Sequence, residues 1–116
     1  CPATGTWEAG VLDYKDIAAN YVTNPAYTRH WDAVSGVPFL YNGDVFVSYD
    51  DAESICLKSD FVMDSGLGGA MVWAASSDRN HELQHVIAAR VLEGRSCSEG
   101  GGAGRRRHRH RRLMRA

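Results

Sequence analysis

The sequence predicts an α/β fold, and three observations support this prediction. Two short runs of β-branched and aromatic residues, Val37–Tyr41 and Val45–Tyr49, flank Asn42-Gly43. This pattern predicts an antiparallel hairpin with its turn at 42–44, because both turn residues tolerate positive φ. The apolar run Ala70–Ala74 is bounded by turn residues and is typical of a strand buried on both faces, as in a parallel sheet. Helical patterns precede and follow that run.

The amino-terminal part predicts loops and one short helix. Residues 1–12 contain Pro and Gly at several positions and are expected to form loop and turn. Apolar residues recur near helical spacing over Asp13–Tyr21, and Asp13 is expected to cap the first turn. Asn24-Pro25 ends this helix. Residues 26–36 are expected to be irregular and to lead into the hairpin.

The second half predicts two helices around the apolar run. Asp50 is expected to cap the first helix, and Glu53 to complete an acidic capping box. This helix should run to about Asp64, where Gly66 stops it. The second helix should cover His81–Leu92. The apolar side chains that these helices are expected to bury are Ile55, Phe61, Val62, Leu83, Val86, Ile87 and Val91.

Charge is unevenly distributed along the chain. The net charge is −1, yet Arg105–Arg115 holds seven of the thirteen Lys and Arg residues. Six basic and fourteen acidic residues precede Gly104, which leaves −8 for the body and +7 for the tail. This argues against nucleic-acid binding except through the basic tail. No apolar run approaches the roughly 18 residues of a spanning helix, so the sequence argues against a membrane protein.

The cysteines and the ends of the chain add two expectations. Cys1, Cys56 and Cys97 show no C-x-x-C spacing, which argues against a cysteine zinc site or redox motif. The chain begins at Cys1 without an initiator Met, and we expect it to be a fragment. Residues 94–116 form a Gly-rich linker and an Arg/His-rich tail that are expected to be disordered.

Four sequence blocks occur in a recognisable order and spacing. They are GTWEAG at 5–10, SYDDAES at 48–54, GLGGAMVW at 66–73 and SDRN at 77–80. On these residues the chain resembles the C-terminal portion of a bacterial chitinase of glycoside hydrolase family 18. The resemblance covers about residues 1–92 and does not extend to the tail.

This resemblance implies an architecture for the parent protein. The family has a (β/α)8 TIM barrel with an α+β insertion domain between the seventh strand and the seventh helix. Residues 1–49 would form the latter part of that insertion domain. Residues 50–93 would form the last barrel units, namely the seventh helix, the eighth strand and the eighth helix.

The resemblance also implies an activity. Family members are secreted enzymes that hydrolyse β-1,4-N-acetylglucosamine linkages of chitin or chitooligosaccharides with retention, and the parent is expected to be a monomer without a cofactor. The N-acetyl group of the substrate attacks, while a Glu that closes a D-x-x-D-x-D-x-E motif protonates the leaving oxygen. This chain has only Asp13-x-x-Asp16, followed by Ala18 and Asn20. The general acid is therefore expected outside this chain, and the isolated chain should be inactive.

Three side chains are candidates for sugar binding. Trp73 resembles the tryptophan beneath the sugar to be cleaved, and Trp7 and Glu8 resemble residues that line the cleft. A flat indole suits the apolar face of a pyranose and keeps its N–H free to donate. The residues alone favour a core tryptophan at position 73 and leave a loop anchor open for Trp7. Ala74 stands where relatives carry Glu.

Two other functions are open. His81, Glu82 and His85 match H-E-x-x-H, in which two His bind zinc and the Glu activates water. A zinc metalloprotease is therefore the main alternative, although a third ligand is missing nearby. A non-catalytic sugar-binding module is the other. The acidic residues at 50–53 resemble a paired-carboxylate site, but their spacing fits a helix cap better.

Overall fold

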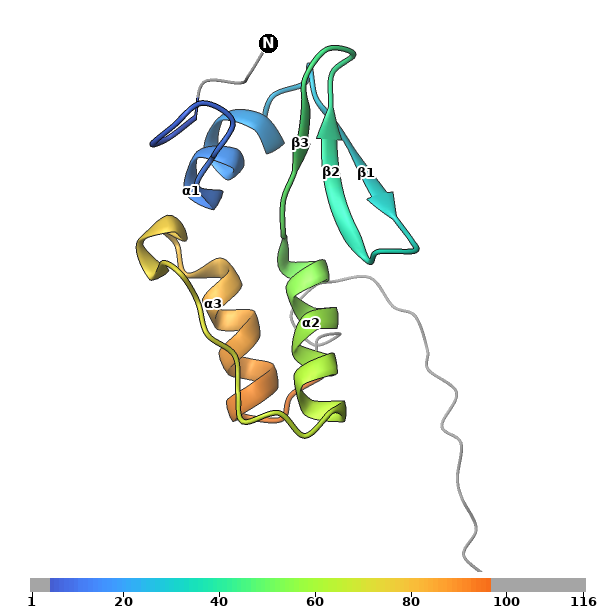
Figure 1. Cartoon of the computed structure of the whole chain (residues 1–116), viewed down its shortest axis with the longest axis vertical. Helices are drawn as coiled ribbons and strands as arrows, with labels where there is room; N and C mark the ends of the chain where they lie inside the picture. The colour runs from blue at the N-terminus through green and yellow to red at the C-terminus, as the bar shows by residue number, and fades with distance from the viewer. Residues whose placement is uncertain (1–4, 97–116) are drawn as a thin grey trace, which may run out of the picture.

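The computed structural model describes residues 5–96 and places a small sheet at one end of a pair of packed helices (Figure 1). The remaining residues, including Cys1, Cys97 and the basic tail, lie outside the described part. In chain order the elements are α1 (Tyr14–Ile17), the π-helical η1 (Ala18–Val22), β1 (Thr28–Asp32), β2 (Val37–Tyr41), β3 (Phe46–Ser48), α2 (Ala52–Asp64), the 3-10 turn η2 (Ala75–Ser77), α3 (Glu82–Ile87) and the π-helical η3 (Ala88–Leu92).

The predicted hairpin is confirmed as strands β2 and β3. They pair antiparallel, with Leu40 opposite Val47. The turn between them depends on Asn42, whose side-chain oxygen accepts hydrogen bonds from the backbone N–H groups of Asp44 and Val45 at 3.0 and 2.7 Å. Gly43 has a φ of +104°, which glycine adopts readily.

The expectation that residues 26–36 are irregular is wrong for Thr28–Asp32. These residues form β1, which pairs antiparallel with β2 and makes the three-stranded order β1-β2-β3. The strand carries no alternating apolar pattern. It is held by its backbone pairing and by cross-strand contacts, such as the stacking of His30 on Phe39 with ring centroids 5.0 Å apart. Such contacts join positions distant in sequence, so the local pattern could not reveal them.

The predicted first helix is confirmed as α1 and η1. Its one buried side chain, Ile17, packs with Leu40, Val47 and Tyr49 in the core between this helix and the sheet. The expected cap by Asp13 is wrong, because Asp13 precedes the helix but its carboxylate makes no cap hydrogen bond. That carboxylate has other partners, which prove central to the candidate site.

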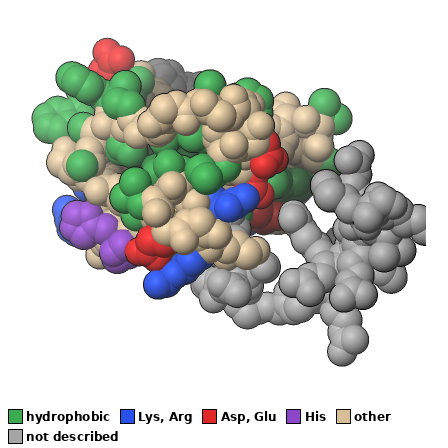
Figure 2. All heavy atoms as spheres, turned by 90° about the horizontal axis from the view of Figure 1, so that it is seen from below, with side chains coloured by type: hydrophobic (Ala, Val, Ile, Leu, Met, Phe, Trp, Pro, Cys, Tyr) green, Lys and Arg blue, Asp and Glu red, His purple; other side chains and the backbone are tan. Residues whose placement is uncertain are grey.

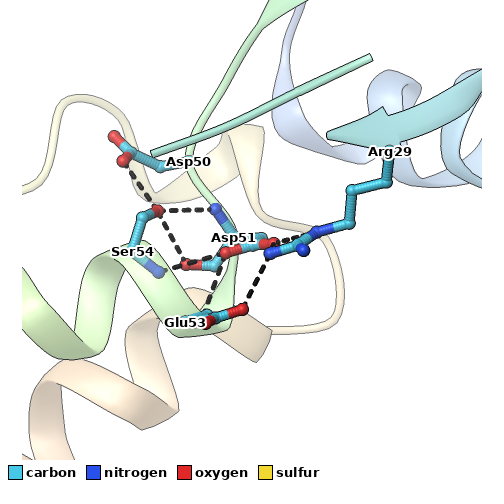
Figure 3. Close-up of polar contacts among 5 residues, drawn as sticks. All are labelled: Arg29, Asp50, Asp51, Glu53 and Ser54. Carbon is cyan, nitrogen blue, oxygen red and sulfur yellow. Dashed lines mark hydrogen bonds and ion pairs between the residues drawn. The ribbon is translucent and has the colours of Figure 1, made fainter. Parts of the chain in front are cut away.

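Helix α2 is confirmed, but its cap lies one residue later than predicted. The Asp51 carboxylate accepts hydrogen bonds from the backbone N–H groups of Glu53 and Ser54 at 3.0 and 3.1 Å. The Ser54 hydroxyl in turn accepts from the Asp51 N–H at 3.0 Å (Figure 3). Ser54, and not Glu53, therefore closes the capping box. Gly66 ends the helix with a φ of +63°, as predicted.

Helices α2 and α3 lie side by side (Figure 1). An ion pair between Asp60 and Arg90 joins α2 to η3. Asp78 is buried and caps α3, since its carboxylate accepts from the backbone N–H groups of residues 82, 83 and 84 at 2.9–3.0 Å. The expected buried position of Phe61 is wrong, because its side chain is 64% exposed. The other six apolar positions expected to be buried are half-buried.

The expected buried strand Ala70–Ala74 does not form. The three strands of the sheet come from residues 28–48, and within residues 5–96 nothing pairs with the 70–74 segment. A strand forms only where a neighbouring strand satisfies its backbone groups. Figure 2 shows apolar side chains gathered on the face seen from below. The exposed large apolar side chains between positions 57 and 92 are Leu57, Phe61, Met63, Leu67, Met71, Val72, Trp73 and Leu92.

None of the helices formed by residues 5–96 is long and apolar enough to span a membrane.

We expect the isolated chain to unfold without a cooperative transition and to be inactive on chitooligosaccharides. The reason is the uncovered apolar surface, of which Met71 at 82% and Leu92 at 81% exposed are examples. Circular dichroism during a thermal scan, together with an amide NMR spectrum, measures this. A sharp thermal transition with dispersed amide signals would contradict the expectation, as would hydrolysis by the pure chain.

Candidate functional site

Trp73 lies in the extended segment between α2 and η2 and is almost fully accessible. Its side chain is 92% exposed, and that of Met71, two residues earlier, is 82% exposed. The peptide bond between Trp73 and Ala74 is cis. No core formed by residues 5–96 covers this indole, so its flat faces are free to contact a ligand.

Trp7 and Glu8 lie at the tip of a tight loop before α1. The loop is closed by a bridge between Glu8 and Val11 and by a hydrogen bond from the Thr6 N–H to the Val11 carbonyl at 2.8 Å. A Cβ at Gly5 would lie 1.5 Å from the Glu8 carbonyl oxygen, so only glycine fits at that position. Trp7 is 80% exposed and Glu8 is also exposed. Both side chains are therefore accessible to a ligand.

Asp13 connects this loop to the segment that follows Trp73. Its Oδ2 atom accepts a hydrogen bond from the Trp7 Nε1–H at 3.3 Å, and its Oδ1 atom accepts one from the Ser77 hydroxyl at 3.1 Å. Lys15 pairs with the same carboxylate at 3.0 Å. The hydrogen bond from Lys15 lowers the pKa of Asp13 below its usual value, and the bonds from Ser77 and Trp7 lower it further. Asp13 was missed as a site residue because Ser77 is distant in sequence.

The half-matched acidic motif Asp13-x-x-Asp16 serves the loop. The Thr6 hydroxyl donates to the Asp16 carboxylate and accepts from the Asp13 backbone N–H at 2.9 Å. The Asp16 carboxylate and the Asp13 backbone N–H therefore hold the loop against the start of α1. A hollow of about 470 Å³ is lined in part by Thr6, Asp16 and Tyr21, and neither of the exposed tryptophans lines it.

The H-E-x-x-H pattern forms no complete metal site in the described part of the chain. His81 has a φ of +56° and precedes α3, so the two His do not share a regular helix. Their ring centroids are 6.4 Å apart, and both side chains are exposed. Among residues 5–96 no group of three His, Cys, Asp or Glu is placed to hold a metal. The zinc protease alternative therefore lacks a third ligand among these residues; the tail histidines lie outside them.

The acidic residues at the start of α2 are held by basic partners. Arg29 on β1 pairs with Asp51 at 2.7 Å and with Glu53 at 2.9 Å (Figure 3). Lys58 pairs with Asp50 at 2.7 Å. Asp51 caps the helix and all three carboxylates form ion pairs, so a helix cap is confirmed at Asp51 and the paired-carboxylate site is not supported.

Comparison with known proteins identifies the family. Residues 2–78 match the sequence model of the glycosyl hydrolases family 18. The chain is 47% identical over 94 residues to chitinase A1 of Niallia circulans. The match covers 79% of this chain and 13% of chitinase A1. It is 34% identical over 93 residues to a probable endochitinase of Orgyia pseudotsugata multicapsid polyhedrosis virus. That match covers 78% of this chain and 16% of the viral protein. The chain therefore belongs to glycosyl hydrolases family 18, as its four sequence blocks indicated.

Solved structures agree with this assignment. Chitinase ChiA74 from Bacillus thuringiensis matches with a TM-score of 0.72 and 36% identity, covering 78% of this chain and 17% of that one. The catalytic domain of psychrophilic chitinase B from Arthrobacter TAD20 matches with a TM-score of 0.67 and 33% identity, covering 79% and 20%. The described fold is thus similar to part of a family of TIM-barrel enzymes. The chain spans a fifth or less of each of these four proteins.

Proposed function

We propose that this chain is the C-terminal portion of the catalytic domain of a chitinase that hydrolyses β-1,4-N-acetylglucosamine linkages. The observation that carries this proposal is the 47% identity to chitinase A1 over 94 residues. The accessibility of Trp73 and Trp7 supports a role for both in contacting sugar. The substrate class is chitin or its oligosaccharides. Binding without hydrolysis by the complete protein would instead favour a sugar-binding module.

We assign residues 1–49 to the latter part of an insertion domain and residues 50–93 to the last units of the barrel. The sheet β1–β3 lies within the first range, and α2 and α3 lie within the second. The apolar, unpaired segment Ala70–Ala74 is suited to become the eighth barrel strand, because strands from the rest of the domain would satisfy its backbone groups. Its position would place Trp73 at the C-terminal end of that strand, where barrel enzymes keep their active sites.

The proposed mechanism is retaining and substrate-assisted. The acetamido oxygen of the substrate forms a bond to the anomeric carbon as the glycosidic bond breaks, and a Glu outside this chain protonates the leaving oxygen. Water then opens the cyclic intermediate with net retention. In this chain, Trp73 supports the reacting sugar, and Trp7 and Glu8 contact sugars along the cleft. Proton NMR that found the α-anomer as the first product of the complete enzyme would contradict this mechanism.

We propose that the parent enzyme is secreted and needs no metal or organic cofactor. Cys56 is disulfide-bonded, and disulfides persist in oxidising compartments outside the cytosol. A free thiol at Cys56 in protein purified without reductant would argue against this location.

In the complete enzyme, Trp73→Ala should lower kcat/KM on chitooligosaccharides by about tenfold or more, which corresponds to about 1.4 kcal/mol. Stacking contributes most where the sugar is distorted toward the transition state. Steady-state kinetics normalised to folded protein measures the effect. Trp31→Ala is the matched control, because this half-buried tryptophan on β1 contacts Arg29 and has no proposed sugar contact. If Trp73→Ala lowers only the yield of folded protein, the sugar-stacking role is wrong.

Trp7→Ala should weaken the binding of long chitooligosaccharides and spare short ones, because Trp7 lies farther along the proposed cleft. We expect a raised KM for chitohexaose and little change for chitotriose, with kcat nearly constant. The same shift for both substrates, or a loss of folded protein alone, would show that Trp7 only anchors its loop.

A further inference from the structure

Among the carboxylates of residues 5–96, Asp13 is distinguished by what its two oxygens contact. Oδ2 accepts from the indole of Trp7 at 3.3 Å, and Oδ1 accepts from the hydroxyl of Ser77 at 3.1 Å. The Asp13 carboxylate thus bonds to Trp7, which is proposed to stack on sugar, and to the segment that follows Trp73, the other proposed stacking residue. Ser77 is four residues beyond Trp73 in the chain.

Further contacts fix the carboxylate in this bridging position. Lys15 pairs with Oδ2 at 3.0 Å and reaches the backbone carbonyl of Ser76 at 3.5 Å. The Asp13 backbone N–H donates to the Thr6 hydroxyl at 2.9 Å, next to Trp7 in the loop. The loop before α1 and the η2 turn are therefore held together through Asp13 and Lys15.

We infer that Asp13 is a positioning residue that sets where Trp7 lies relative to Trp73, and so controls the affinity for long chitooligosaccharides. This inference rests on the proposed function of the two tryptophans. Asp13 itself need not touch sugar: its effect passes through the indole N–H of Trp7. The side chain at this position must bond through two different atoms, because the Trp7 N–H and the Ser77 hydroxyl lie against different oxygens of Asp13.

The charge of Asp13 suits this role across the neutral range. The pKa of Asp13 lies below its ordinary value of 3.8, mainly because Lys15 donates to it. The carboxylate therefore stays ionised and keeps accepting both hydrogen bonds until the pH falls below that value. Below its lowered pKa, Asp13 becomes protonated and loses part of its capacity to accept hydrogen bonds.

A second polar contact in the molecule provides a matched control. Arg29 also joins the two parts of the chain, through Asp51 and Glu53 at 2.7 and 2.9 Å (Figure 3). Its side-chain bonds and its ring contact within residues 5–96 are with Asp51, Glu53 and Trp31, and not with the two exposed tryptophans. Removing Arg29 should therefore weaken the contact between sheet and helix without changing the discrimination between long and short substrates.

The test is a double-mutant cycle in the complete enzyme, with KM and kcat measured on chitotriose and chitohexaose. Asp13→Ala should raise KM for chitohexaose by roughly threefold to tenfold and leave chitotriose and kcat little changed. The double variant Trp7→Ala/Asp13→Ala should be no worse than Trp7→Ala alone, because both changes remove the same contact. Arg29→Ala should lower the melting temperature without a length-dependent shift.

Two milder variants keep the test decisive if Asp13→Ala does not fold. Asp13→Asn retains one acceptor for the Trp7 N–H and an amide that can donate to Ser77, so it should recover most of the chitohexaose affinity. Ser77→Ala removes a single hydrogen bond and should give a smaller KM rise in the same direction. The inference is overturned if neither Asp13→Ala nor Ser77→Ala changes KM for chitohexaose. If Asp13→Ala does not fold, an unchanged KM for chitohexaose in Ser77→Ala alone overturns it.

Failure of the inference and failure of the proposed function give different results. If Trp7→Ala leaves KM for chitohexaose unchanged, the proposed role of Trp7 is wrong and the inference falls with it. If Trp7→Ala raises that KM but Asp13→Ala does not, only the positioning role is wrong. Additive effects in the double variant would also overturn the positioning role, because Asp13 would then act independently of Trp7.

Discussion

The arrangement of this chain depends on a few polar contacts between its first 49 residues and the helical part. The compact apolar cluster of Ile17, Leu40, Val47 and Tyr49 belongs to the first part. The link to the helices includes Arg29 at the start of α2 and Asp13 at the η2 turn. Because hydrogen bonds are directional, these contacts fix orientation more strictly than a small apolar interface would.

Apolar side chains are exposed unevenly over the described residues. The segment around Trp73 and the outer face of α2 remain open, and the chain covers only 13% of chitinase A1 and 17% of ChiA74. In the proposed assignment, the rest of a barrel would cover the aliphatic part of this surface and leave the indole of Trp73 at the mouth of the cleft. In this assignment, the aliphatic side chains are exposed because the rest of the barrel is absent, and Trp73 is exposed because it contacts sugar.

Local sequence signals predicted what local interactions determine. Asn42-Gly43 located the hairpin and Gly66 located the end of α2, since each acts on adjacent residues: Asn42 through its side chain and the two glycines through a positive φ. Strand β1 was missed because its own residues show no alternation of apolar and polar side chains, and its pairing with β2 depends on residues elsewhere in the chain. The bridging role of Asp13 was missed because it depends on Ser77, distant in the chain. The run Ala70–Ala74 was composed like a buried strand, yet a strand also needs partners. The four sequence blocks identified the family but not the contacts that hold its site.

The most direct test of the central proposal replaces the matching 94 residues of chitinase A1 with the corresponding part of this chain. The chimera should fold cooperatively and hydrolyse chitooligosaccharides with a kcat/KM within about tenfold of chitinase A1, because this chain would supply the proposed last barrel units and the two tryptophans proposed to contact sugar. A chimera that folds with a cooperative thermal transition but shows no hydrolysis would contradict the account.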